Sequence, residues 1–169
     1  MSGLLIFQVV AIPLLLLAAL RDIATRLIPD GFSIAIALAG LASRMTVGPW
    51  EAGLSLTIGA ALFAALLPLA ARGMLGGGDV KLMAAMAVGL APGETLDFVV
   101  ATVFAGGVLG VAYILARYLV PQPRVAGGGT LLRRVMAVEA WRVRRRGPLP
   151  YAVAIAVGGI LVLLSLPRA

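Results

Sequence analysis

Two aspartates beside long apolar runs are the residues of this chain best suited to chemistry. Asp79 lies in Gly76-Gly77-Gly78-Asp79-Val80-Lys81-Leu82, a glycine-rich break between two apolar runs, and Asp22 follows the first apolar run. A carboxylate beside hydrocarbon is energetically costly, so an acid in this setting marks a functional site by default. Consecutive glycines also let a second backbone approach closely. The alternative interpretation is an ordinary loop between two helices, in which Asp79 is solvated.

Two carboxylates held close together can perform acid–base chemistry, because both do not ionise easily at once. The ionised acid removes a proton from water, which attacks a carbonyl group, while the neutral acid donates to the developing oxyanion. The chain has no His and no Cys, which excludes an imidazole base, a thiolate nucleophile and Cys-ligated zinc. The chemistry we expect of Asp22 and Asp79 is therefore peptide hydrolysis without a metal or cofactor. Hydrophobic periodicity alone does not show that the two residues meet.

The composition predicts a membrane protein. Hydrophobic residues make up 62% of the chain and charged residues 12%, and the mean hydropathy is +1.08. A membrane-spanning helix needs about 20 apolar residues, so 169 residues allow about six spans and no separate soluble domain. We predict an all-α, polytopic membrane protein with one membrane-embedded domain over residues 1–169. The expected spans are residues 3–20, 31–46, 52–71, 80–91, 98–120 and 151–166.

The fourth expected span, residues 80–91, is unusually short. At about 1.5 Å per residue it reaches only about 18 Å, against a hydrocarbon core of about 30 Å. If Pro92-Gly93 marks the far surface, Asp79 lies within the membrane slab. Irregular backbone at that depth is tolerated only where protein buries it or where it lines a water-filled cavity. This geometry favours a site over a simple loop.

Basic residues predict the orientation. When loops are assigned alternately to two sides, Arg44 and Arg168 fall on one side, and the other twelve of the 14 basic residues fall on the opposite side: Arg21, Arg26, Arg72, Lys81, Arg117, Arg124, Arg133, Arg134, Arg142, Arg144, Arg145 and Arg146. The basic side is expected to be cytoplasmic. Asp22 and Asp79 then share the cytoplasmic side, and both termini face outward. The net charge of +7 is explained by these loops, so we expect no nucleic-acid partner.

Residues 121–148 form the expected cytoplasmic basic loop, and arginines interleaved with apolar residues after Gly129 indicate a helix lying on the membrane surface. We assign this loop contacts with anionic lipids and no binding of a basic substrate segment.

Other polar residues on the expected cytoplasmic side each allow two interpretations. Asp30 follows Pro29 and is expected to cap the second span, and the alternative is a direct role in the chemistry. Lys81 either contacts a carboxylate or substrate, or is an ordinary interfacial lysine. Tyr151 follows Pro150 at the start of the last span, where it is either an interfacial aromatic or part of the site's lining.

Three segments together resemble the type IV prepilin peptidases. Gly76 to Leu82 resembles the family's GxGD motif in its GxGDVKL form. Asp22, with Arg26 and Ile28-Pro29-Asp30, is similar to the segment around the family's first aspartate. Pro150-Tyr151-Ala152 resembles the motif that opens the family's last helix. The resemblance covers essentially the whole chain, in the same order and on one expected side of the membrane.

The resemblance implies an intramembrane aspartic endopeptidase of the bacterial inner membrane with Asp22 and Asp79 as its catalytic pair. Gly76, Gly78, Lys81, Pro29, Pro150 and Tyr151 are implied as motif or substrate-binding residues. The implied substrate is a prepilin, whose basic leader is removed at the cytoplasmic face. The chain is most similar to the short members that serve Flp/Tad-type pili, with archaeal preflagellin peptidases as relatives. Larger members carry a Cys-containing cytoplasmic domain after the first helix, and this chain has no Cys, so we expect no N-methyltransferase activity.

Two interpretations from other classes remain open. The two aspartates would also serve as a proton relay in a small proton-coupled transporter. A non-catalytic subunit of a secretion machine is the third possibility.

Overall fold

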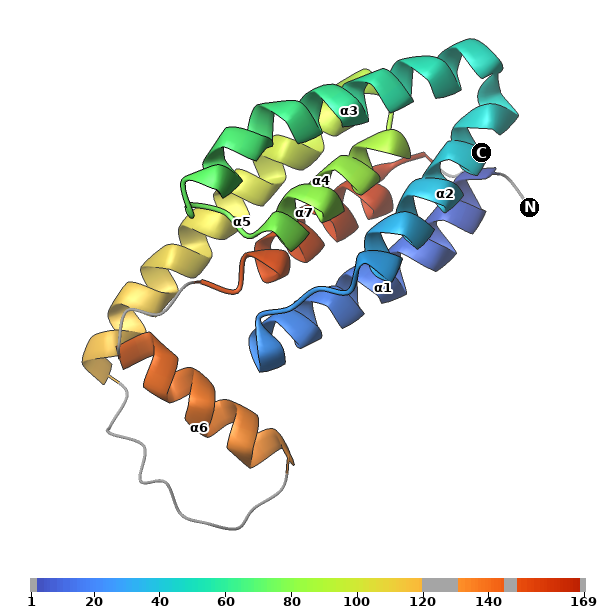
Figure 1. Ribbon diagram of the computed structural model, residues 1–169. Coiled ribbons are helices and arrows are strands. Elements are labelled where there is room, and N and C mark those ends of the chain that lie inside the picture. Colours follow the sequence, from blue (N-terminus) through green and yellow to red (C-terminus); the bar gives the residue numbers. More distant parts are fainter. Residues whose placement is uncertain (1–2, 120–130, 145–148, 168–169) are drawn as a thin grey trace.

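The structure, a computed structural model, describes residues 3–119, 131–144 and 149–167. Within these residues the chain is all-helical (Figure 1), with helices α1 (Gly3–Thr25), α2 (Asp30–Val47), α3 (Pro49–Ala71), α4 (Gly77–Val88), α5 (Pro92–Leu119), α6 (Leu131–Arg144) and α7 (Tyr151–Ser165). Every expected span corresponds to one helix, which confirms the predicted all-α, polytopic fold class.

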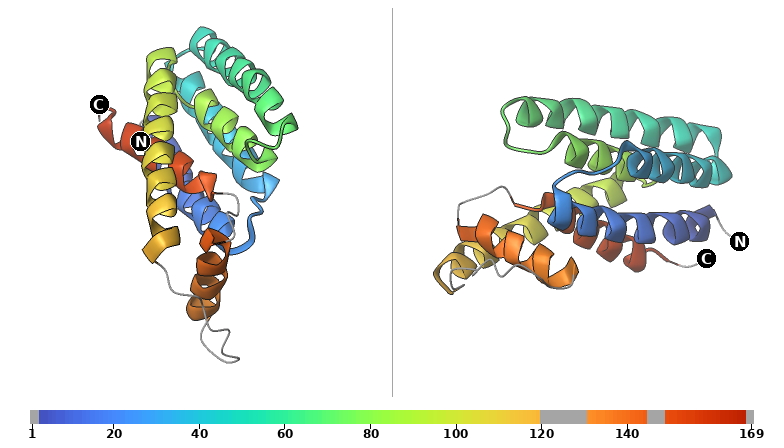
Figure 2. Two further views of the ribbon diagram at one scale, coloured as in Figure 1. Left: turned by 90° about the vertical axis from the view of Figure 1, so that its left-hand side faces the viewer. Right: turned by 60° about the horizontal axis from the view of Figure 1, so that its bottom comes forward.

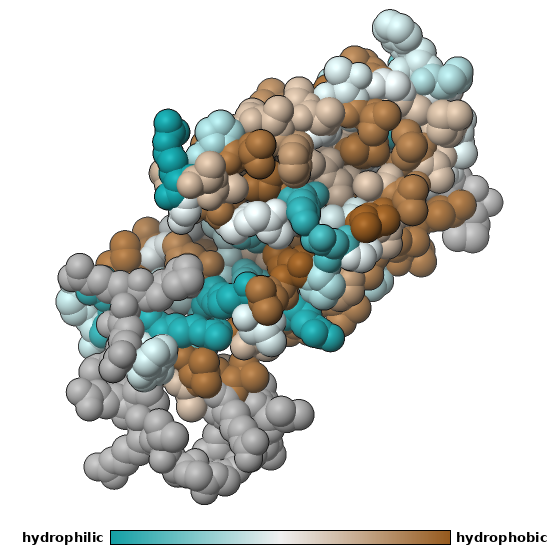
Figure 3. All heavy atoms as spheres, viewed as in Figure 1, coloured by the Kyte–Doolittle hydropathy of each residue, from teal (hydrophilic) through white to brown (hydrophobic). Residues whose placement is uncertain are grey.

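Within the part of the chain that the structure describes, four helices are long and apolar enough to cross a membrane: α1, α2, α3 and α5. Helix α7 is apolar but has only 15 residues, and α4 is shorter still at 12 residues. Large apolar side chains such as Val103, Phe104 and Val108 lie on the outside of the bundle. Brown apolar surface dominates over α2 and α3, and hydrophilic side chains gather toward the α6 end of the same face (Figure 3). An apolar exterior of this extent is typical of a lipid-facing surface.

The two short apolar helices, α4 and α7, lie inside the bundle. Helix α4 packs against α2, α3 and α7, and α7 packs against α1, α5 and α4. The largest buried side chains come from α4 and α7 and from the segments packed around them: Phe7, Leu15, Ile36, Leu82, Met86, Leu90, Phe98, Ile155 and Leu163. A short helix surrounded by longer ones keeps its ends within the depth of the bundle, so polar groups at those ends are shielded by protein.

Contacts at both ends show that α1 and α7 run antiparallel. The Gln8 side chain near the start of α1 donates a hydrogen bond to the Leu163 carbonyl near the end of α7. At the opposite end, the Ala152 amide at the start of α7 donates to Asp22 near the end of α1. The start of α1 and the end of α7 therefore share one end of the bundle, and α6 lies at the other (Figures 1 and 2).

Three helix boundaries differ from the expected ones. Helix α1 continues to Thr25, so Asp22 lies in a helix and not in the expected polar turn. Helix α4 begins at Gly77, three residues earlier than expected, so Asp79 lies in its first turn and the glycine segment is largely helical. Helix α5 begins at Pro92, where Glu94 accepts a hydrogen bond from the Ala91 amide at 2.7 Å. A glutamate at the third helical position that accepts a hydrogen bond from the amide just before the helix stabilises the helix start.

Helix α6 confirms the helix expected within the basic loop. The rest of that loop, including Gly127-Gly128-Gly129, lies outside the described residues.

Candidate active site

Asp79 is fixed by the start of its own helix. Gly76 is the residue that precedes α4, and its carbonyl accepts the first helical hydrogen bond from the Val80 amide at 3.2 Å. The Asp79 carboxylate accepts a hydrogen bond from the Gly76 amide. Amides in the first turn of a helix lack internal partners, and a carboxylate at the third helical position satisfies one of them. The carboxylate is thereby held against the backbone of Gly76.

Glycine at this helix start is required by two close approaches. A Cβ atom on Gly76 would lie 2.7 Å from Oδ2 of Asp79, and one on Gly78 would lie 3.1 Å from Cβ of Ile28. Ile28 belongs to the connection between α1 and α2, so this connection packs directly on the start of α4. The glycine motif and the Ile28-Pro29 segment, which are far apart in the sequence, therefore meet at one place.

Asp22 is fixed by the start of a different helix. Pro150 precedes α7 and provides no side-chain hydrogen bond to it. The Ala152 amide in the first turn instead donates to Oδ2 of Asp22 at 3.1 Å. An acid from α1 thus caps α7, and the partial positive charge at a helix start favours a carboxylate there.

The two aspartates lie at the same end of the bundle. Asp22 is 6% exposed and Asp79 is 7% exposed, and the charge of Asp22 acts on Asp79. Oδ1 of Asp79 is buried without a hydrogen-bond partner among the described residues. A buried acceptor left unpaired is unfavourable and calls for an explanation, of which a catalytic role is one. The structure thus brings together two shielded carboxyl groups, as acid–base chemistry by a pair requires.

Tyr151 also belongs to this site. The charge of Asp79 acts on it, and its ring packs against α5, because a Cβ atom on Gly106 would lie 3.0 Å from the ring. Of the two interpretations offered by the sequence, the structure favours a lining position.

A cluster of polar residues that sequence reasoning did not assign to the site connects α6 to the end of α1. Arg26 pairs through Nη2 with Glu139 of α6, and the Tyr113 hydroxyl of α5 donates to the same carboxylate oxygen. Arg142 contacts the other oxygen of Glu139 at 3.2 Å and donates to the Ile23 carbonyl at 2.8 Å. The sequence offered one signal of this cluster, because Glu139 is the only acid in residues 121–148. The side chains of Arg26, Glu139 and Arg142 are 15%, 14% and 20% exposed.

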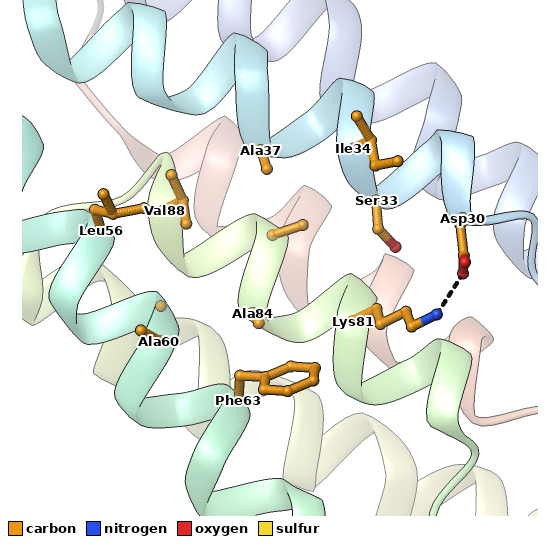
Figure 4. A pocket seen from close by; sticks show the side chains of 12 residues that line it. Asp30, Ser33, Ile34, Ala37, Leu56, Ala60, Phe63, Lys81, Ala84 and Val88 are labelled. Carbon is orange, nitrogen blue, oxygen red and sulfur yellow. Dashed lines mark hydrogen bonds and ion pairs between the residues drawn. The ribbon is translucent and has the colours of Figure 1, made fainter.

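Asp30 and Lys81 lie away from the acid pair. Asp30 is the first residue of α2, preceded by Pro29, so its predicted capping role is wrong. Its carboxylate instead pairs with Lys81 at 2.8 Å. This exposed pair closes one end of a groove of about 520 Å³ between α2, α3 and α4, lined mainly by apolar side chains such as Phe63 and Val88 (Figure 4).

The groove is on the other side of α4 from Asp79. Lys81 follows Asp79 by two residues, which turns its side chain roughly 200° around a helix of 3.6 residues per turn. Lys81 lines the groove and Asp79 does not. The candidate active site is therefore the pair of buried acids and not this groove.

Among the described residues there is no group of three or more His, Cys, Asp or Glu that could hold a metal ion. The site consists of carboxylates, backbone amides and the nearby Arg26 cluster.

The fold and the site define a polytopic membrane protein that gathers two carboxyl groups at the ends of its inner helices. Residues 9–111 match the sequence model of the type IV leader peptidase family, a range that includes Asp22 and Asp79 and more than half of the chain. The chain belongs to the type IV leader peptidase family.

The chain is also similar to a characterised relative. It is 35% identical over 159 residues to the prepilin leader peptidase/N-methyltransferase of Bacillus subtilis (strain 168). The match covers 92% of this chain and 54% of the relative, so the chain spans about half the length of that curated protein. No solved structure matches the chain.

Proposed function

We propose that this chain is an intramembrane aspartic endopeptidase that removes the basic leader from a prepilin. The observation that carries the proposal is the placement of Asp22 and Asp79, which come from separate helices and are both buried, at one end of the bundle, where the charge of Asp22 acts on Asp79. Family membership supports the proposal, as does the relative named a prepilin leader peptidase/N-methyltransferase.

The surroundings of the two acids suggest a division of labour. Both acids accept a backbone hydrogen bond at the start of a helix, Asp22 at α7 and Asp79 at α4, so this contact does not distinguish them. Asp22 has no buried oxygen left without a partner among the described residues, and it is the base in our mechanism. Oδ1 of Asp79 is buried without a partner, and a neutral carboxyl group is the form that tolerates such burial best. Asp79 is therefore the proton donor.

Hydrolysis then proceeds in two steps. Asp22 takes a proton from a water molecule while the water oxygen bonds to the scissile carbonyl carbon. At the same time, Asp79 gives its proton to the carbonyl oxygen. In the tetrahedral intermediate, Asp22 returns its proton to the departing amine as the C–N bond breaks, and Asp79 recovers a proton from the hydroxyl group as the carbonyl re-forms. The two acids thus exchange roles as donor and acceptor within one turnover.

Charge and family membership support a proposal for the side of the membrane and the substrate class. We propose, from the distribution of basic residues, that the acids lie at the cytoplasmic face of the bacterial inner membrane, where the basic leader of a Flp-type prepilin would lie. We propose peptide cleavage without N-methylation, because α1 and α2 are joined only by residues 26–29 and the sequence has no Cys.

The experiment is incubation of the purified full chain, in lipid vesicles, with a synthetic prepilin-like peptide that carries a basic leader and an apolar segment. Mass spectrometry should detect one new N-terminus at the boundary between the two. Addition of S-adenosylmethionine should leave that N-terminus unmodified. Proton-coupled uptake by the vesicles without any cleavage would favour the transporter alternative and contradict the proposal.

A further inference from the structure

Arg26 occupies an unusual position directly after α1. Its φ is 58°, a left-handed conformation that favours glycine and is uncommon for other residues. Its amide donates to the Asp22 carbonyl at 2.9 Å, which turns the chain at the end of the helix. Since glycine would suit this backbone better, the arginine side chain is expected to have a purpose of its own.

The Arg26 side chain is hydrogen-bonded through one of its three nitrogens, and the other two lack partners among the described residues. Nη2 binds Glu139 of α6, whereas Nε and Nη1 are buried without hydrogen-bond partners among the described residues. The charge of Arg26 acts on both Asp22 and Asp79. Buried donors of Arg26 and the buried, unpaired acceptor Oδ1 of Asp79 are thus complementary groups in one small region.

Among the described side chains, the charges of this region balance only when the acid pair carries a single negative charge. Arg26, Glu139 and Arg142 together carry one net positive charge, and the ionisable Tyr113 is held as a donor to Glu139. One ionised aspartate cancels the excess, whereas two ionised or two protonated aspartates leave a net charge. Uncompensated charge in a protein interior at membrane depth is strongly disfavoured.

We propose that Arg26, anchored by Glu139 on α6, is a positioning residue that keeps the Asp22–Asp79 pair in its singly ionised form. This inference rests on the proposed peptidase function and assigns α6 a part in it. Helix α6 then completes the site, in addition to any contact that it makes with lipid.

The test compares Arg26→Gln with Arg21→Gln, which removes the same charge from the exposed side of the same helix end. Cleavage of the prepilin-like peptide is measured from acid to neutral pH for both variants and for Arg26→Lys and Glu139→Gln. Without the cation, ionisation of the pair requires a higher pH. The acidic limb of the Arg26→Gln profile should therefore move by about one unit toward neutral pH, with about a tenfold loss of activity on that limb.

The other variants should follow from the same contact. Arg26→Lys should restore most of the wild-type profile, and Arg21→Gln should leave the profile unchanged. Glu139→Gln removes a negative charge from the same region, so its profile should move toward acid pH, opposite to that of Arg26→Gln.

Three results would overturn the proposal. If wild-type protein cleaves and Arg26→Gln loses activity equally at every pH, Arg26 only anchors α6, and the peptidase function stands. If Arg26→Gln retains the wild-type profile and activity, the proposal fails and the function again stands. If wild-type protein cleaves nothing, the proposed function itself fails, and the positioning role fails with it.

Discussion

Gly76 offers a way to displace the Asp79 carboxylate without replacing Asp79 itself. In Gly76→Ala the new Cβ atom would lie 2.7 Å from Oδ2 of Asp79, and ordinary contact begins near 3.4 Å. The oxygen must therefore move by about 0.7 Å if the backbone stays in place. The backbone at Gly76 has φ −68° and ψ 140°, which alanine adopts readily, so the perturbation falls on the carboxylate.

The expected consequence is a loss of catalysis. A misplacement of about 1 Å in an active site can cost about 10²-fold in rate. For the smaller shift at Asp79 we expect a loss of about 10- to 100-fold in kcat/KM, equivalent to about 1.4–2.7 kcal/mol of transition-state stabilisation. The loss of glycine before the helix should reduce stability by no more than about 1 kcal/mol.

The matched control is Gly77→Ala, one residue further along. A Cβ atom there meets nothing within 4 Å, and alanine is favoured over glycine within a helix. Both variants are assayed for peptide cleavage and for thermal unfolding in the same vesicles or detergent. If Gly76→Ala cleaves as well as Gly77→Ala, the position of the Asp79 carboxylate does not limit the reaction, and the reasoning from its geometry is refuted.

The remaining predictions concern the Asp30–Lys81 ion pair and the orientation of the chain. Asp30→Asn and Lys81→Met should each retain most of the cleavage activity, since an exposed ion pair contributes about 0–1 kcal/mol; loss of cleavage with unchanged thermal unfolding would bring Asp30 or Lys81 into the catalytic machinery. Alkaline phosphatase fused after Arg168 should be active and the same enzyme fused near Gly128 should be silent, because the basic loop is expected in the cytoplasm. The reverse pattern in phosphatase assays would place the acids on the wrong side for a cytoplasmic leader.

Most of the fold was predictable because its signals are local. Long apolar runs predict membrane helices from residue types alone, and each expected span is a helix. Helix ends were less predictable, because the groups that cap a helix end can come from a distant part of the sequence. Asp22 lies inside α1, and its carboxylate caps α7, a contact between residues far apart in the sequence. Asp30 was assigned a capping role because aspartates commonly cap helices. In the structure its carboxylate instead forms an ion pair with Lys81 of α4.

The site was predictable only as a set of residues. Glycines and aspartates indicated where chemistry could occur, and the structure places Asp22, Asp79, Pro150 and Tyr151 at one end of the bundle. The contact of Arg26 with α6 was not predictable, because Glu139 stands among arginines in a stretch whose composition indicates a lipid-facing surface. Only packing of α6 against α1 and α5 shows that this acid is turned toward the protein.

The most direct test of the central claim is cleavage of the prepilin-like peptide by Asp22→Asn, Asp79→Asn and the double variant, each at normal abundance in the membrane. Asparagine keeps the size of the side chain but neither accepts nor donates the catalytic proton. We predict that each single variant loses cleavage and that the double variant is about as inactive as either one, because the two acids act as a unit. Substantial cleavage by either single variant would contradict a mechanism that needs both aspartates.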